Sequence, residues 1–225
     1  MFEKRINIFT GHFGSGKTEV AVNYAWHMAN AGFKSAIVDF DIVNPYFRTA
    51  DAKAALEQKG IRVVLPLYAN TNVDVPAIPA EIYSLFQDKA YKVVLDIGGD
   101  DVGAKAVSRF QEEIMSDDYE MYFVINTRRI MTDTPEKVVA MIEEIQYSAN
   151  IPITKLVNNT NVLEFTTPEI VKEGMEKIQE VSKKIGVPVG VVAGMKDVVA
   201  PFGGKLDGTE LLELNKMIFL PWDRE

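Results

Sequence analysis

A glycine-rich segment close to the N-terminus carries the strongest chemical signal in the sequence. Its residues are Gly11-His12-Phe13-Gly14-Ser15-Gly16-Lys17-Thr18. They match the pattern Gly-x-x-x-x-Gly-Lys-Thr, in which the backbone N–H groups of a tight loop surround phosphate oxygens. An apolar run precedes the segment and a helical pattern follows it, which is the context that this chemistry requires. The sequence therefore predicts a nucleoside triphosphate site.

Each residue type in this phosphate loop has a chemical role. The lysine pairs with the β- and γ-phosphates, so Lys17 is expected to be catalytic as well as nucleotide-binding. The hydroxyl of Thr18 is expected to ligate Mg²⁺, and the positive end of the helix that follows attracts anions. The predicted nucleotide-binding residues of this segment are Gly11, Gly14, Ser15, Gly16, Lys17, Thr18 and Glu19.

A carboxylate at the end of a second buried strand pattern is the expected partner of the metal ion. The run Lys92–Ile97 is apolar at its centre and contains Asp96, and a glycine pair follows it. Mg²⁺ at a phosphate site needs such an acidic side chain. We expect Asp96 to hold Mg²⁺ through water and the N–H of Gly99 to reach the γ-phosphate. Asp100 and Asp101 come next and are expected to cap the following helix.

Two further carboxylates stand at the end of the strand pattern Ser35–Asp39, and the first of them is Asp39 itself. The second is Asp41, two residues beyond Asp39. Hydrolysis needs a residue within hydrogen-bond reach of the attacking water, and a loop that leaves a neighbouring strand can supply it. The alternative interpretation is that both carboxylates are solvated charges at a strand end.

The order of these motifs resembles the MinD/ParA/CobQ branch of P-loop ATPases, and the resemblance covers most of the chain, loosely after residue 126. Asp39-Phe40-Asp41-Ile42 is the closest local match and is similar to the switch I segment of MinD-type proteins. The resemblance implies ATP and Mg²⁺ as cofactors. It also implies that Asp41 orients the attacking water as the catalytic residue, with Asp39 in a supporting position near the metal.

The sequence departs from that family at the second residue of the phosphate loop. The family's loop begins Lys-Gly-Gly, and its lysine reaches across a nucleotide-bridged dimer, whereas this chain has His12 and Phe13. His12 takes a lesser part of that role or fills the loop, and filling is the simpler interpretation. Arg128 and Arg129 follow another strand pattern and are candidates for charge supplied in cis or in trans, or else for a solvated surface role.

The segment Lys155–Asn161 bears on the choice of base, because it ends a strand pattern with Asn-Asn-Thr-Asn. GTPases of related folds use Asn-Lys-x-Asp at such a place, and this chain lacks that lysine and aspartate. An asparagine amide can both donate to and accept from an adenine edge. We therefore expect ATP and ADP rather than guanine nucleotides, with Asn158 as the base contact and Gly194–Val199 as another wall of the pocket.

Strand and helix patterns alternate along the chain. The strand patterns are Ile6–Thr10, Ser35–Asp39, Arg62–Leu65, Lys92–Ile97, Met121–Asn126, Ile153–Val157 and Val189–Ala193. Their β-branched, apolar composition is typical of strands buried on both faces. Thr134-Pro135 and Thr167-Pro168 have the form of an N-cap followed by proline at the first helical position. The alternation predicts an α/β, three-layer P-loop NTPase fold with a mainly parallel sheet flanked by helices, in one domain of residues 1–225.

The composition excludes several classes of protein. Among 225 residues there are no cysteines, and the formal net charge is −8. The lack of cysteine excludes thiolate metal sites and fits a reducing compartment, while the negative charge disfavours nucleic acid and anionic lipid as partners. The sequence shows no signal-peptide layout and no apolar run of membrane-spanning length. We expect a cytoplasmic protein with no nucleic-acid or membrane partner.

Three functions fit these observations. The leading one is a regulatory or chaperone-like ATPase that switches an unidentified protein partner or a nucleotide-dependent homodimer. The second is a small-molecule or nucleotide kinase with Asn44–Arg48 in its acceptor pocket, and the third is a nucleotide sensor that barely hydrolyses. A GTP-dependent maturation factor becomes the better interpretation if guanine nucleotides bind more tightly. The apolar tail Leu211–Leu220 is expected to pack in the core or in a dimer.

Overall fold

A computed structural model describes residues 1–40, 49–66 and 81–219. Nine strands of these residues form one sheet in the order β3-β2-β4-β1-β5-β6-β7-β9-β8. The strands are β1 (Ile6–Thr10), β2 (Ser35–Phe40), β3 (Arg62–Val64), β4 (Lys92–Ile97), β5 (Tyr119–Ile125), β6 (Lys155–Asn158), β7 (Val189–Met195), β8 (Lys205–Leu206) and β9 (Thr209–Leu214). Every pairing is parallel except that of β8 with β9.

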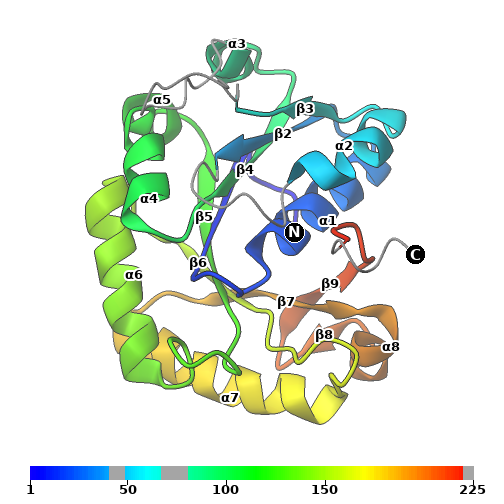
Figure 1. Cartoon of the computed structure of the whole chain (residues 1–225), viewed down its shortest axis with the longest axis vertical. Helices are drawn as coiled ribbons and strands as arrows, with labels where there is room; N and C mark the ends of the chain where they lie inside the picture. Colours follow the sequence, from blue (N-terminus) through cyan, green and yellow to red (C-terminus); the bar gives the residue numbers. More distant parts are fainter. Residues whose placement is uncertain (41–48, 67–80, 220–225) are drawn as a thin grey trace.

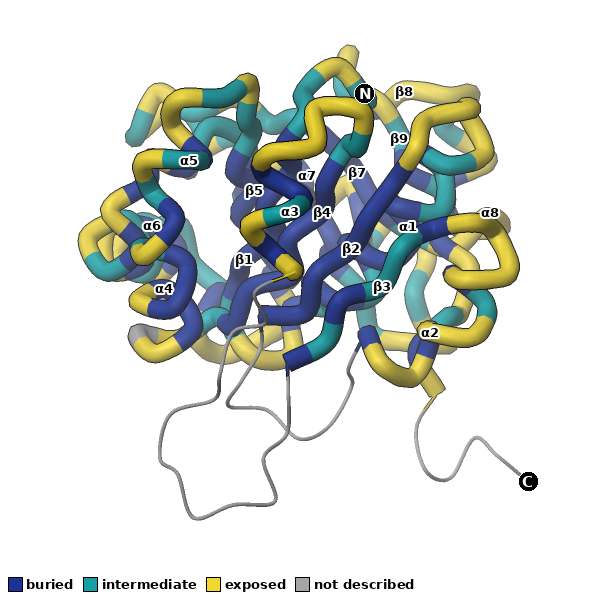
Figure 2. The backbone as a smooth tube through the Cα atoms, turned by 90° about the horizontal axis from the view of Figure 1, so that it is seen from above, coloured by how far each residue is buried: buried dark blue, intermediate teal, exposed yellow. Residues whose placement is uncertain are grey.

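Helices cover both faces of this sheet (Figure 1). They are α1 (Lys17–Asn30), α2 (Thr49–Gln58), α3 (Glu81–Gln87), α4 (Asp101–Ser108), α5 (Gln111–Met115), α6 (Pro135–Ala149), α7 (Pro168–Ile185), α8 (Lys196–Val199) and the 3₁₀ turn Ala200–Phe202. In Figure 2 the central strands are mostly buried, and the exposed residues lie mainly on the helices and loops around them. The predicted three-layer α/β architecture, with a mainly parallel sheet flanked by helices, is therefore confirmed.

The two largest clusters of the core lie on opposite faces of the sheet, and a smaller third one joins α7, β7, β8 and α8. On one face, α1 and α2 pack against β-strand residues that include Phe9, Ile37 and Val94. On the other face, α3 to α7 pack against residues of the opposite parity, such as Ile8 and Leu95. Successive side chains of a strand point to opposite faces. Alternate residues along a strand therefore pack against different helices, and the odd or even position of a residue decides which face of the sheet its side chain lies on.

Local sequence explains where the long helices begin. The side chain of Thr134 accepts a hydrogen bond from the N–H of Lys137 at the start of α6, and that of Thr167 accepts one from Ile170 at the start of α7. Each threonine is followed by proline at the first helical position, where a missing N–H costs nothing. Both caps confirm the prediction made from the Thr-Pro pairs.

The C-terminal part of the described chain adds two strands that the sequence patterns did not predict. β9 pairs with β7 in parallel and β8 folds back on β9. Leu212, Leu214 and Ile218 are buried in the α1 side of the core, as expected for an apolar tail that packs inward. Glutamates interrupt the run Thr209–Leu214 without regular alternation, so its period gave no strand signal.

The length and the composition of each helix decide whether it could span a membrane. None of them, within the described residues, is both long enough and apolar enough to cross a bilayer.

Candidate functional site

The glycine-rich segment connects β1 to α1 at the carboxyl edge of the central strands, as predicted (Figure 1). Gly14 and Gly16 have φ values of 78° and 81°, in the left-handed region where a side chain is disfavoured. Lys17 and Thr18 open α1 and are each only 7% exposed. The first N–H groups of a helix have no partner within it, so this loop ends in free backbone donors.

Several carbonyl groups of the phosphate loop accept hydrogen bonds from the protein. The carbonyl of His12 accepts from the N–H of Ser15 at 2.9 Å. The carbonyl of Gly14 accepts from Nε of Arg129 at 3.0 Å, and that of Ser15 accepts from Nδ2 of Asn159 at 2.7 Å. These bonds fix the direction of the peptide groups, which is what a loop needs in order to present N–H groups to an anion.

A buried hydroxyl tests whether this loop fits a phosphate. Oγ of Ser15 is buried and has no hydrogen-bond partner among the residues that the structure describes. A buried polar atom in that condition costs free energy unless a ligand or water satisfies it. The phosphate oxygens of a nucleotide would accept from this hydroxyl, so the residues present fit the ligand that the motif predicts.

The loop after β4 lies directly against the phosphate loop. A Cβ atom added to Gly99 would stand 1.8 Å from the carbonyl oxygen of Gly11. Only glycine allows so close an approach of two backbones. The predicted γ-phosphate contact, Gly99, is thus held beside the loop that it was expected to serve. The next residue, Asp100, caps α4 by accepting from the N–H of Gly103 at 2.8 Å, which confirms its predicted capping role.

Asp39 and Asp96 occupy facing positions on the neighbouring strands β2 and β4. They are 4% and 1% exposed. Each stands two residues after a strand residue that packs against α1, namely Ile37 and Val94, so both carboxylates point toward the α1 face. Thr18, the predicted metal ligand, lies in the first turn of that helix.

This placement suits Mg²⁺. Two buried carboxylates side by side repel each other unless a cation or a proton offsets their charge. Oδ2 of Asp96 accepts from Oγ1 of Thr49 at 3.3 Å, a bond that orients the carboxylate. Within the described ranges, no three His, Cys, Asp or Glu side chains gather as a self-sufficient metal site. Mg²⁺ commonly uses one or two carboxylates together with nucleotide phosphates and water.

Part of the predicted site cannot be placed. Asp41, the expected catalytic residue, lies outside the described residues. The segment 44–48, named for the kinase alternative, lies outside them as well.

The side chain of Glu19 points away from the phosphate loop. Its carboxylate accepts from the N–H groups of Met217 and Ile218 at 2.7 and 3.1 Å, and from Nδ2 of Asn23 at 3.0 Å. Burial raises the pKa of Glu19 to about 6, although these donors act to lower it. The carboxylate therefore anchors the segment after β9 to α1, and the predicted nucleotide contact at Glu19 depends on its backbone N–H alone.

Asn158 is fully buried and its amide is used inside the protein. Nδ2 donates to the carbonyl of Val171 at 2.9 Å, and Oδ1 accepts from the N–H of Thr160 at 3.0 Å. Asn158 shares its parity with Leu156, whose side chain lies in the core on the face opposite α1. This geometry gives no support to the predicted contact with the adenine edge.

Asn159, which the sequence analysis missed, meets the phosphate loop instead. Its parity is that of Val157, whose side chain lies on the α1 face. Counting parity from the apolar residues of β6 would have singled it out. The other predicted wall of the base pocket, Gly194–Val199, consists of the end of β7 and α8.

Asn126 joins the loops after β5 and β6. Its Oδ1 accepts from the N–H groups of Arg128 and Asn161, and its Nδ2 donates to the carbonyl of Asn161. Since Asn159 joins the β6 loop to the phosphate loop, the loops after three adjacent strands form one hydrogen-bonded unit. Such a unit restricts the positions that the phosphate loop can adopt.

His12 forms its hydrogen bond within its own loop. Nδ1 lies 2.7 Å from the carbonyl oxygen of Phe13, so this nitrogen carries the proton and donates. That contact fits a residue that fills the loop. Phe13 itself is 61% exposed.

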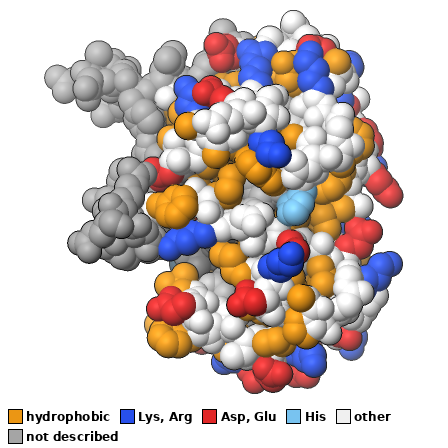
Figure 3. Space-filling model, turned by 90° about the vertical axis from the view of Figure 1, so that its right-hand side faces the viewer, with side chains coloured by type: hydrophobic (Ala, Val, Ile, Leu, Met, Phe, Trp, Pro, Cys, Tyr) orange, Lys and Arg blue, Asp and Glu red, His pale blue; other side chains and the backbone are white. Residues whose placement is uncertain are grey.

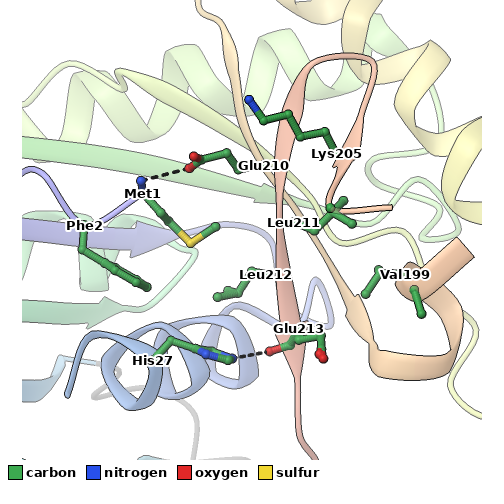
Figure 4. A pocket seen from close by; sticks show the side chains of 11 residues that line it. Met1, Phe2, His27, Val199, Lys205, Glu210, Leu211, Leu212 and Glu213 are labelled. Carbon is green, nitrogen blue, oxygen red and sulfur yellow. Dashed lines mark hydrogen bonds and ion pairs between the residues drawn. The ribbon is translucent and has the colours of Figure 1, made fainter. Parts of the chain in front are cut away.

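A cavity of the described structure lies away from the phosphate loop. It has a volume of about 560 Å³ and is lined by Met1, Phe2, His27, Val199, Ala200 and residues 204–205 and 210–213 (Figure 4). His27, in the last turn of α1, donates to the carbonyl of Glu213 at 2.7 Å. It is about 15 Å from the start of that helix at 1.5 Å per residue. Among the described residues on the side of the molecule nearest to β9, hydrophobic, acidic and basic side chains are mixed, and the basic ones form no continuous surface (Figure 3).

Comparisons with known proteins bear on the fold. No protein-family model matches the chain, and no curated protein matches it. Among solved structures it is similar to FtsY from Mycoplasma mycoides, with a TM-score of 0.54 and 17% identity over 87% of this chain and 62% of that chain. It is also similar to chloroplast FtsY from Physcomitrella patens, with a TM-score of 0.58 and 16% identity over 84% of this chain and 58% of that chain.

A third similar structure is that of FlhF complexed with GTP/Mg²⁺, with a TM-score of 0.56 and 16% identity over 87% of this chain and 68% of that chain. The chain spans less than two thirds of the length of both FtsY chains. At these identities the likeness concerns the fold, which is that of P-loop NTPases. The narrower resemblance to the MinD/ParA/CobQ branch stays a prediction.

Proposed function

We propose that the chain binds ATP with Mg²⁺ and hydrolyses it, and that the nucleotide state switches a protein partner in a regulatory or chaperone-like role. The observation that carries this proposal is the phosphate loop. It combines left-handed glycines, a buried Ser15 hydroxyl that lacks a partner among the described residues, and Lys17 with Thr18 at the start of α1. This arrangement is suited to the phosphates of a nucleotide.

The proposed chemistry assigns a task to each side chain. The loop N–H groups and Lys17 hold the β- and γ-phosphates, while Thr18 and Asp96 hold Mg²⁺, which offsets the charge of the phosphates. Asp39 supports that site from the neighbouring strand. Asp41 orients a water molecule for in-line attack on the γ-phosphorus. The bond from that phosphorus to the β–γ bridging oxygen breaks, and ADP and phosphate leave.

Exposed apolar side chains at the rim of the site support the switch. They belong to the loops after β1, β5 and β6, which share the carboxyl edge of the sheet. Their members are Phe13 (61% exposed), Ile130 (80%), Met131 (50%), Leu163 (65%) and Phe165 (74%). Apolar groups beside a phosphate site are suited to a protein that docks when the nucleotide orders the loops. A second copy of this chain, in a nucleotide-dependent homodimer, is one form of such a partner.

Adenine remains the proposed base because the chain lacks the lysine and aspartate of the Asn-Lys-x-Asp pattern. The buried position of Asn158 removes the positive argument for adenine and leaves only that negative one. One of the similar folds was solved with GTP/Mg²⁺. The competing candidate is therefore a GTP-dependent maturation factor on the same fold.

Thermal unfolding with ATP, ADP and GTP, each with Mg²⁺, tests the proposal on the wild type and on Lys17→Ala. A ligand at a hundred times its Kd adds about 2.7 kcal/mol to the free energy of unfolding. Stabilisation of the wild type by ATP, its loss in Lys17→Ala and slow phosphate release are the expected results. Preferential stabilisation by GTP would replace ATP in the proposal, and no stabilisation by any nucleotide would refute it.

A further inference from the structure

Arg128 and Arg129 are adjacent in the sequence but meet different partners. Both lie in the turn after β5, which is braced by hydrogen bonds from the N–H of Arg129 to the carbonyl of Asn126 and from the N–H of Thr132 to the carbonyl of Arg129. Arg128 pairs with the carboxylate of Glu173 on α7. Arg129 turns to the phosphate loop. The two side chains thus form a natural comparison of a surface arginine with one at the site.

Arg129 reaches the phosphate loop because of the sheet order. β1 and β5 are parallel neighbours, with Thr10 opposite Phe123, so the loops that leave both strands share one edge. Nε of Arg129 donates to the carbonyl of Gly14 at 3.0 Å. A Cβ atom added to Gly14 would lie 3.5 Å from that same nitrogen. The guanidinium group therefore packs against Gly14 as well as bonding to it.

The bond from Nε occupies one of five donors. Guanidinium carries five N–H groups in a planar fork and stays charged at all relevant pH values. Within the described part of the chain, the terminal nitrogens of Arg129 have no hydrogen-bond partner or ion pair, and the side chain is exposed. A permanent positive charge with free donors thus lies at the loop where phosphates are expected.

We infer that Arg129 is a positioning residue of the phosphate loop. By bonding to the carbonyl of Gly14 it fixes the neighbouring peptide groups in the orientation that binds the β- and γ-phosphates. It also adds positive charge in cis, so the chain contains its own arginine at the site. This inference rests on the proposed function, because it concerns nucleotides that carry at least two phosphates.

Binding and turnover of ATP–Mg²⁺ and binding of ADP–Mg²⁺ by Arg129→Ala, Arg129→Lys, Arg128→Ala and Lys17→Ala test the inference. Loss of a charge-assisted hydrogen bond predicts a Kd for both nucleotides that is about tenfold higher or more in Arg129→Ala. Arg128→Ala is the matched control and should stay within about twofold of the wild type, as expected for an exposed ion pair. Arg129→Lys should recover part of the affinity, because its ammonium group keeps the charge and can donate to the same carbonyl.

Two readouts separate positioning from general damage. The unliganded Arg129→Ala and Arg128→Ala proteins should unfold at the same temperature. Free guanidinium ion, at a concentration too low to denature, should restore nucleotide affinity to Arg129→Ala and not to Lys17→Ala.

The inference is overturned if Arg129→Ala and Arg128→Ala bind nucleotides equally well. It is also overturned if neither lysine nor guanidinium ion restores affinity. If Lys17→Ala loses binding while Arg129→Ala keeps it, only this inference fails. If the wild type binds no nucleotide, the proposed function fails, and the inference with it.

Discussion

Asn159 donates its side-chain amide to the carbonyl of Ser15 at 2.7 Å, across 144 positions of sequence. The contact is close: a Cβ atom added to Gly16 would stand 2.4 Å from the same amide nitrogen. The loop after β6 is thereby fixed to the centre of the phosphate loop. Any change that moves one of these loops must move the other.

Replacing Asn159 with alanine should weaken both the fold and the site. The carbonyl of Ser15 would lose its buried partner, which predicts a loss of about 1–3 kcal/mol in the free energy of unfolding. Nucleotide affinity should fall with it because the loop becomes less ordered. Urea unfolding and calorimetric titration measure the two effects. Asn30→Ala, at the exposed far end of α1, is the control. If Asn159→Ala binds nucleotide with wild-type affinity, the hydrogen bond from Asn159 to Ser15 is not needed for binding.

Replacing Gly99 with alanine should separate two backbones that now touch. The added Cβ would overlap the carbonyl oxygen of Gly11 at 1.8 Å, so the phosphate loop or the loop after β4 must shift. We expect at least about a tenfold loss of nucleotide affinity, since misplacement of about 1 Å at a site can cost a hundredfold in rate. Gly190→Ala is the matched control, because its Cβ meets the flexible side chain of Lys155. Equal binding by both variants would contradict the close approach.

Replacing Asp96 with asparagine should weaken the binding of Mg²⁺ and leave the direct contacts between the protein and the nucleotide unchanged. If Asp96 holds Mg²⁺ through water, the Mg²⁺ concentration needed for half-maximal ATP stabilisation should rise about ten- to a hundredfold. A thermal-shift titration of Mg²⁺ at fixed ATP measures it. Asp207→Asn, at a left-handed hairpin position that asparagine tolerates, is the control. An unchanged Mg²⁺ requirement would remove Asp96 from the metal site.

Asp117 should give the fold a distinctive acid sensitivity. Burial acts to raise its pKa, but hydrogen bonds from Arg5 and Lys89 outweigh that effect and lower the pKa to about 2. A carboxyl with a depressed pKa stabilises the folded state at pH values above its unfolded pKa of about 3.8, and this contribution is lost as the pH falls toward 2. Asp117→Asn should therefore be less stable at neutral pH and should lose less stability between pH 4 and 2.

Urea unfolding across that pH range compares Asp117→Asn with Asp118→Asn. Asp118 is the matched control because it forms its ion pair, with Lys4, at the exposed surface. Identical pH profiles for the two variants would show that the pair with Arg5 contributes nothing of its own.

The sequence predicted the layers of this fold and the elements around the phosphate loop because those features depend on local pattern. A buried strand, a glycine loop and a helix start each have a signature within a few residues. Which of Asn158 and Asn159 meets the phosphate loop was not predicted, for a different reason. It depends on which face of the sheet α1 covers, and that follows from strand order rather than from the loop sequence.

The hydrogen-bond partners of Glu19 and Arg129 could not be predicted from the sequence either. Glu19 meets the chain again at Met217, and Arg129 meets Gly14 only because β5 lies beside β1. Contacts over such separations are set by topology, which one sequence does not specify.

The bond from Met217 to Glu19 spans 198 positions of the chain, and it has a consequence for the order of events during synthesis. The helix that carries Lys17 and Thr18 leaves the ribosome well before Met217, which anchors it. Chains grow at about 5–20 residues per second, so the nascent helix waits roughly ten seconds or more for that anchor. A chain that stops before Met217 would contain every residue of the nucleotide motif. It would still lack the hydrogen bond from Met217 to Glu19 that holds this helix in place.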